Sequence, residues 1–312
     1  MKKFEQIIGY KEIAAAVDLP INEICNLIDP KDLSELTFRY LEKNEILEVE
    51  DKVQSTLNDI ALPKAGADRL DTWEQGWSEI LVNIRSEGVT RKTLTPQYFH
   101  HNTFRYAGRY IQSETYDFEQ NLFEIFRTII VKKYLETAGH IVELGCGTGI
   151  NLFLISKILK NTKLTGCDWS EASQQIISHI NLSLKEKIVP INLNLLTLKG
   201  WENIEINSTT AILTFHALEQ LGANTELLIA AIVDAKPQIC VHIEPIIELY
   251  DLRNEFDKKA HSYHIKRNYL KGFYSSLIRL ENSGKIKLLK VKRTEFGSKF
   301  HEAYTIIVWK VV

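Results

Sequence analysis

The sequence predicts an α/β protein whose carboxyl-terminal part is a doubly wound, mostly parallel seven-stranded sheet with a terminal antiparallel hairpin. Three observations predict it. From residue 138 onward, short apolar runs alternate with helical stretches, as in a parallel sheet covered by helices. A glycine-rich turn joins the first run to the first helix, and two strand-like runs end the chain. Residues 1–137 lack this alternation, so we expect a mainly helical amino-terminal region there and a separate domain over 138–312.

The elements of the second domain are expected in a fixed order. Helices should run over Ile150–Lys160, from about Glu171, and over Thr225–Asp234, and a helical segment should follow over about 246–282, where apolar residues recur at three- and four-residue steps. The last two strands should be joined through Phe296-Gly297-Ser298. The expected strands are His140–Leu144, Lys163–Asp168, Lys187–Leu193, Thr209–Phe215, Gln238–Glu244, Lys285–Arg293 and Glu302–Lys310.

Residues 1–137 are rich in Glu, Leu, Ile and Ala. Breaks are expected at Ala61–Gly66, which has the proline and glycine of a linker, and at Gly88–Pro96. The stretch Arg105–Tyr110 is dense in aromatic and cationic side chains, and the following helix, Phe118–Leu135, leads into the first strand. This region is therefore expected to supply a substrate pocket, a lid or a dimerisation surface.

Composition excludes several classes of protein. The 312 residues are 45% hydrophobic and contain four cysteines, too few for disulfide bonds to stabilise so long a chain. No apolar run is long enough to span a membrane, and none follows the first lysines as in a signal peptide, so we expect a cytoplasmic protein. The net charge is −2. Residues 252–312 carry an excess of basic residues, which a solvated helix face and a Lys-rich strand explain and which could also attract an anionic ligand or nucleic acid.

The chemistry is indicated by the stretch Val142-Glu143-Leu144-Gly145-Cys146-Gly147-Thr148-Gly149, between the first strand and the first helix. Three glycines at alternate positions let the backbone turn tightly and approach a ligand. A dinucleotide site needs its third glycine one residue later, where this chain has Ile150. Glu143, two places before the first glycine, suits a cationic ligand better than a pyrophosphate.

The turn resembles the E-x-G-x-G-x-G turn of the class I S-adenosylmethionine (SAM) dependent methyltransferases. The resemblance covers about 138–312 and implies SAM as cofactor, S-adenosylhomocysteine (SAH) as product, and transfer of a methyl group. It also implies that Asp168 accepts the ribose hydroxyls and that Trp169 packs on the adenine. Asn194 stands where the family often has an acidic residue that contacts the adenine. The cofactor residues expected on these grounds are Glu143, Gly145, Cys146, Gly147, Gly149, Asp168, Trp169, Asn194 and Phe215.

Ligands of open α/β sheets lie beyond the carboxyl ends of the strands, so catalytic residues are sought after the fourth and fifth strands. These positions hold His216 and Glu244, of which Glu244 is the preferred candidate. The basic and aromatic stretch Tyr263–Tyr269 suits an anionic group of the substrate. His261 and His264 lack further ligands at metal-binding spacing, and no metal site is expected.

The resulting hypothesis is an enzyme that methylates an oxygen or nitrogen atom of a small molecule by in-line displacement. Residues 11–50 faintly resemble the winged-helix dimerisation modules of small-molecule O-methyltransferases, which would make the protein a homodimer. Two alternatives remain open at this stage. One is a methyltransferase acting on RNA or protein, although no RNA-binding module is evident. The other is a SAM-binding protein without catalysis.

Overall fold

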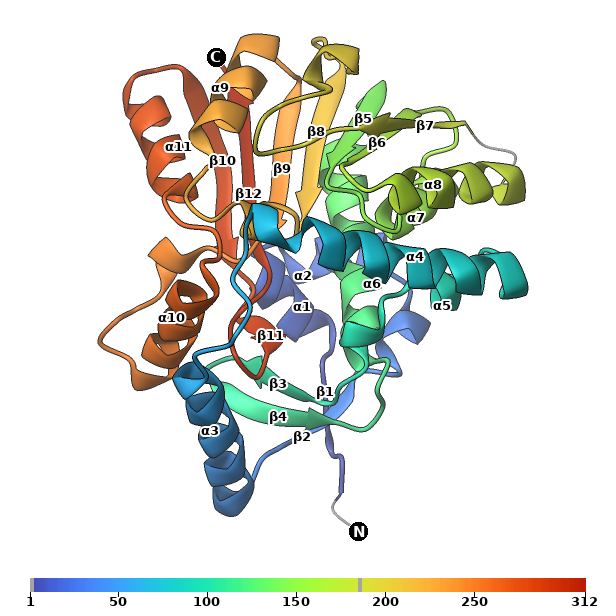
Figure 1. Cartoon of the computed structure of the whole chain (residues 1–312). Coiled ribbons are helices and arrows are strands. Elements are labelled where there is room, and N and C mark those ends of the chain that lie inside the picture. The colour runs from blue at the N-terminus through green and yellow to red at the C-terminus, as the bar shows by residue number, and fades with distance from the viewer. Residues whose placement is uncertain (1–2, 185–186) are drawn as a thin grey trace.

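The computed structural model describes residues 3–184 and 187–312 and contains two sheets (Figure 1). The larger sheet has seven strands in the order β10-β12-β9-β8-β5-β6-β7. The strands from β9 to β7 pair in parallel, whereas β12 pairs antiparallel with both β9 and β10. This is the predicted fold class. The strands are β5 (His140–Leu144), β6 (Lys163–Asp168), β7 (Ile188–Asn192), β8 (Thr210–Phe215), β9 (Ile239–Glu244), β10 (Ile286–Arg293) and β12 (Thr305–Val311).

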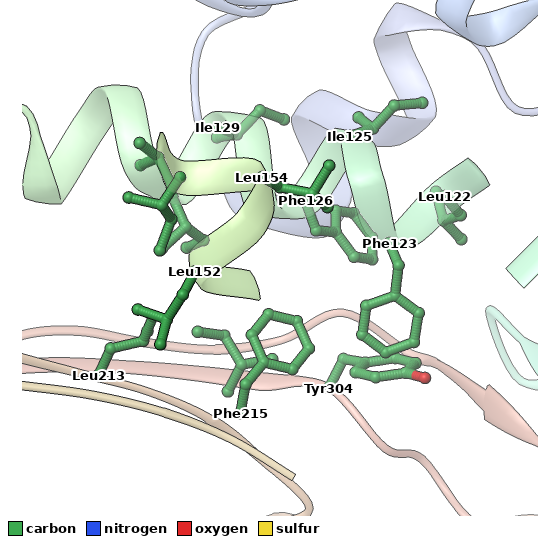
Figure 2. Close-up of a cluster of buried hydrophobic side chains, with 14 of the residues drawn as sticks. Leu122, Phe123, Ile125, Phe126, Ile129, Leu152, Leu154, Leu213, Phe215 and Tyr304 are labelled. Atoms are coloured by element: carbon green, nitrogen blue, oxygen red, sulfur yellow. The ribbon is translucent and has the colours of Figure 1, made fainter. Parts of the chain in front are cut away.

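Helices cover this sheet and bury its apolar residues. One cover is α6 (Phe118–Ile130), which continues as the π-helical turn η4 (Val131–Leu135) into β5. Figure 2 shows its side chains meeting those of α7 and β8 in one buried cluster. The other covering helices are α7 (Ile150–Ile158), α8 (Glu171–Leu184), α9 (Glu226–Ala235) and α11 (Phe273–Asn282), whereas α10 (Glu255–Arg267) packs against the amino-terminal region. The segment predicted as helical over 246–282 is thus two helices, because Asn268 and Gly272 adopt left-handed backbone conformations between them.

The smaller sheet is a correction to the sequence analysis. Four of its five strands lie in the region that was expected to be mainly helical: β1 (Gln6–Ile7), β2 (Thr37–Tyr40), β3 (Thr103–Tyr106) and β4 (Arg109–Ser113). The fifth is β11 (Phe296–Ser298), the tripeptide predicted to be a hairpin turn, which pairs with β3. These strands have two to five residues, too few for an alternating pattern to be recognised. The carboxyl-terminal part therefore completes a sheet of the amino-terminal part.

The helices of the amino-terminal region surround this small sheet and reach the large one. They are α1 (Tyr10–Val17), α2 (Ile21–Leu27), α3 (Lys43–Asn58), α4 (Leu70–Glu87) and α5 (Arg91–Leu94). Helix α4 packs along α8 and crosses the carboxyl-terminal edge of the large sheet (Figure 1). The expected linker at 61–66 lies between α3 and α4, and the N–H of Ala65 donates to the carbonyl of Arg267 at 2.7 Å. Within the described ranges, no helix is long and apolar enough to cross a membrane.

Candidate active site

The glycine loop joins β5 to α7 in a conformation that requires glycine. Gly145, Gly147 and Gly149 have φ values of +74°, +51° and +69°. A Cβ atom at Gly145 would lie 2.3 Å from the Cβ of Ala217, and one at Gly149 would lie 2.5 Å from the Cδ1 of Ile177. The loop therefore packs directly against the end of β8 on one side and against α8 on the other.

Asp168 fixes the loop to the end of β6. Its two carboxylate oxygens accept the N–H groups of Gly147 at 2.9 Å and Ser170 at 3.0 Å. Burial raises the pKa of Asp168 to about 6, although these two hydrogen bonds oppose the shift. The side chain lines a cavity, and half-buried Trp169 lies beside it on the same wall.

Glu143 lies behind that wall and does not line the cavity. It is fully buried, and Asn151 Nδ2 donates to its Oε1, whereas its Oε2 has no hydrogen-bond partner in the part of the chain that the structure describes. Asn151 in turn accepts from Arg127 Nε, and both of these residues line the cavity. Burial raises the pKa of Glu143 to about 8. Of this hydrogen-bonded chain, Arg127 and Asn151 face the cavity and Glu143 does not.

The cavity has a volume of about 780 Å³ and is lined by residues from both parts of the chain. The large sheet contributes the glycine loop, Asp168 and the ends of β8 and β12, and the amino-terminal region contributes aromatic side chains. Trp73 and Trp77 of α4 stack with ring centroids 5.4 Å apart, and Tyr98 packs edge-on against Trp73. None of these three was singled out in the sequence. The aromatic residues lining the cavity are Trp73, Trp77, Tyr98, Phe99, Phe123, Trp169, Phe215, Tyr263, Tyr269, Phe300 and Tyr304.

A polar cluster lies within this aromatic lining, in which Glu119 and Tyr304 are buried and His101 and His216 are half-buried. The hydroxyl of Tyr304 donates to Glu119 Oε1 at 2.7 Å, and the Tyr304 ring stacks on His216 with centroids 4.5 Å apart. His101 Nε2 lies 3.4 Å from Glu119 Oε2. All four side chains line the cavity. Burial raises the pKa of Glu119 to about 8 and lowers that of His216 to about 3.

A second group of charged side chains lines the cavity away from Asp168. It comprises Lys52, Arg69, Arg267 and Lys299, together with Glu219. The guanidinium groups of Arg69 and Arg267 lie 5.5 Å and 5.0 Å from the ring centroids of Trp73 and Tyr269. Their Nε atoms are buried without a hydrogen-bond partner among the described residues. Both guanidinium groups therefore lie against aromatic rings at the cavity wall.

Of the predicted cofactor residues, Gly145, Cys146, Gly147, Asp168, Trp169 and Phe215 line the cavity. Gly149 and Glu143 support the loop from behind. Asn194 does not face the cavity, because its Oδ1 accepts the N–H groups of Leu196 and Thr197 in a turn. Leu193 and Leu195 line the cavity in its place.

Of the two predicted catalytic residues, the structure brings only His216 to the cavity. Glu244 is fully buried at the end of β9, where its Oε1 accepts the N–H of Ala217 at 3.0 Å. Because side chains alternate along a strand, Glu244 was expected at the edge of the sheet where ligands bind. The loop after β8 instead lies between Glu244 and the cavity. His264 is buried as well and forms a 2.9 Å hydrogen bond with His301. In the described ranges, no group of three or more His, Cys, Asp or Glu residues is arranged to hold a metal ion.

The sequence matches no known protein family and no curated protein. Solved structures are nevertheless similar over most of the chain. The [4+2]-cyclase SpnF has a TM-score of 0.50 and 12% identity over 80% of this chain and 98% of its own. The plantazolicin methyltransferase BpumL, solved with SAH, has a TM-score of 0.43 and 15% identity over 85% of this chain and 98% of its own. Human N-acetylserotonin methyltransferase, solved with SAM, has a TM-score of 0.45 and 11% identity over 85% of this chain and 66% of its own.

The strand order, the glycine loop and the acidic residue that ends β6 define the class of fold. The chain has the fold of the class I SAM-dependent methyltransferases. The sequence resemblance had implied this fold, and that prediction is confirmed.

Proposed function

We propose that this protein is a SAM-dependent methyltransferase that methylates an oxygen or nitrogen atom of a small molecule. One observation carries the proposal: the glycine loop and Asp168 line one cavity together with aromatic, charged and polar side chains from both parts of the chain. A fold of this class without such a cavity would support cofactor binding alone.

The residues present fit SAM. Asp168 faces the cavity, and each of its oxygens accepts one backbone N–H, so a lone pair on each stays available for a ribose hydroxyl. The backbone of residues 145–148 lines the cavity without bulky side chains, and Trp169 offers an aromatic face. Arg127 offers a cation for a carboxylate. When bound, SAM supplies a methyl group attached to a positively charged sulfur, and the protein's part is to orient the acceptor and exclude water.

A small-molecule acceptor is supported by the size and the aromatic lining of the cavity. Its volume of about 780 Å³ falls in the range typical of small-molecule pockets. Helix α4 and the turn η3 (Gln97–Phe99) cover it with Trp73, Trp77 and Tyr98. An RNA or protein substrate would need an open groove beside the glycine loop. We therefore propose that the amino-terminal region covers the substrate pocket. His216, which follows β8, is proposed to contact the acceptor.

The test is transfer of label from methyl-labelled SAM into a cell extract, followed by separation by size. Label in the low-molecular-weight fraction is the expected result, and at a SAM concentration below the wild-type Kd it should fall at least about tenfold with Asp168→Ala. Label in RNA or protein would refute the small-molecule assignment. Calorimetric SAM binding without label in any fraction would instead leave a non-catalytic or cyclase-like role.

A further inference from the structure

We propose that Glu119 is the general base of this site and that the acceptor is therefore a hydroxyl group. The inference rests on the proposed methyltransferase function and deepens it. Amines with a free lone pair need no base, whereas a neutral hydroxyl has to lose its proton as the oxygen attacks. Such a reaction requires a group that accepts this proton. A buried carboxyl group that lines the cavity and has one oxygen without a hydrogen bond meets that requirement.

The position of Glu119 follows from helix α6, which presents Glu119, Phe123 and Arg127 to the cavity at successive four-residue steps. Eight residues of α-helix span about 12 Å, so Glu119 and Arg127 lie about that far apart along one side of the helix. Arg127 is joined through Asn151 to Glu143 at the glycine loop. Phe123 lies between the two ends, with its ring 3.9 Å from that of Tyr304 and edge-on to it (Figure 2). Glu119 is thus placed at the acceptor end of the cavity, away from the loop.

The two oxygens of Glu119 have different surroundings. Oε1 accepts the Tyr304 hydroxyl, which holds the carboxyl group in one orientation. Oε2 is buried and makes no hydrogen bond within the described residues, since His101 Nε2 lies 3.4 Å away without the geometry of one. A buried polar atom without a partner carries a free-energy cost that a bound hydroxyl donor would remove. Oε2 is therefore the atom assigned to the acceptor.

His216 is the weaker candidate for the base, although it lines the same cavity. Its ring stacks flat on Tyr304, and burial lowers its pKa to about 3, so it has little affinity for a proton. Burial instead raises the pKa of Glu119 to about 8, which suits proton uptake near neutral pH. Of the titratable groups around Glu119, burial also lowers the pKa of His101 and raises that of Tyr304 well above its usual value.

The step balances as follows. The acceptor oxygen forms a bond to the methyl carbon of SAM, and the carbon–sulfur bond breaks with its electron pair on sulfur. The O–H bond electrons stay with the oxygen, and the proton passes to Oε2 of ionised Glu119. The products are a methyl ether, SAH and a protonated Glu119 that returns its proton to water.

The test compares Glu119→Gln, Tyr304→Phe and wild type, with Glu124→Gln as the matched control. Glu124 lies on the same helix, is partly exposed and pairs with Arg91 outside the cavity. SAM affinity by calorimetry should stay within about threefold of wild type in all variants, which also shows that they fold. Methyl transfer at neutral pH should fall at least about 100-fold in Glu119→Gln, within the usual range for a lost general base, and should be unchanged in Glu124→Gln.

Two readouts separate a base from a structural residue. The rise of wild-type kcat/KM with pH toward 8 should vanish in Glu119→Gln and move to higher pH in Tyr304→Phe, because the Tyr304 hydroxyl favours the ionised carboxylate. In the SAM-free protein, the infrared difference spectrum between wild type and Glu119→Gln should show a carboxylic-acid C=O band that titrates over the same pH range.

The labelled product should be a methyl ether. An N-methylated or C-methylated product, transfer in Glu119→Gln within threefold of wild type, or a Glu119 carboxyl already ionised at pH 5 would each overturn the proposal while leaving the methyltransferase function intact. A wild-type protein that binds no SAM or transfers no label would refute the proposed function itself, and the role of Glu119 with it.

Discussion

Replacing Gly145 with alanine tests whether the glycine loop is as tightly packed as its geometry indicates. The new Cβ would lie 2.3 Å from the Cβ of Ala217, and the residue would keep a φ of +74°. A left-handed conformation costs a non-glycine residue about 1–2 kcal/mol, and overpacking adds about 1–3 kcal/mol. The expected loss of unfolding free energy is therefore about 2–5 kcal/mol, and SAM affinity should fall at least tenfold because both the loop and Ala217 have to move.

Gly108→Ala is the matched control for this variant. Gly108 has a φ of +75°, nearly the same as Gly145, but a Cβ there would meet nothing within 4 Å. Only the conformational cost of about 1–2 kcal/mol should appear, with SAM affinity unchanged. With a urea m value of about 3 kcal/mol/M, the midpoint should fall by about 0.7–1.7 M for Gly145→Ala and by about 0.3–0.7 M for Gly108→Ala. Equal midpoints and equal SAM affinities in the two variants would refute the contact with Ala217.

Four further changes test the rest of the site. Asp168→Ala should weaken SAM binding at least tenfold, about 1.4 kcal/mol, by calorimetry; unchanged affinity would remove Asp168 from the cofactor site. Glu244→Gln should leave methyl transfer near wild type, because Glu244 binds the N–H of Ala217 behind the cavity; a large loss at normal SAM affinity and stability would restore its predicted catalytic role. Arg267→Ala should raise the acceptor KM roughly tenfold at constant kcat if an anionic group binds there, and an unchanged KM would exclude that contact. Urea unfolding of Glu119→Gln should show a gain over wild type that grows from pH 5 to pH 8. Burial raises the Glu119 pKa from 4.5 to about 8, so the unfolded wild-type chain binds fewer protons in this window and wild-type stability falls as pH rises; a constant difference would contradict the shift.

The large sheet was predictable from sequence because its signals are local and long enough to recognise. Each parallel strand is a short apolar run bounded by turn residues, and the ends of β5 and β6 match the prediction to the residue. The small sheet was not predictable for the opposite reason. Its strands are very short, and β11 pairs with β3 nearly two hundred residues earlier, so its stability comes from tertiary contacts such as that between the tilted rings of Phe104 and Phe296.

The cofactor side of the site was also partly predictable, since a loop that needs left-handed backbone at alternate positions leaves a glycine pattern. The roles of single side chains were harder to predict. Alternation along a strand shows on which face of the sheet a side chain lies, but not which other residues cover it. Glu244 shows this: its place at the end of β9 was correctly predicted, yet the loop after β8 covers it. Asn194 is similar, since its oxygen is used by its own turn.

No sequence motif marks the residues proposed to contact the acceptor, but the sequence of α6 contains one indication of them. Its apolar residues recur with helical periodicity, and Glu119 interrupts their buried face. A carboxyl group on that face has to find a partner or shift its pKa, and here it does both, through Tyr304 and through burial. The same helix carries Arg127 toward the glycine loop, so one helix fixes the distance between Glu119, the proposed base, and the proposed cofactor end of the cavity. If the proposal holds, the helix that leads into β5 is the part of the chain that selects the acceptor.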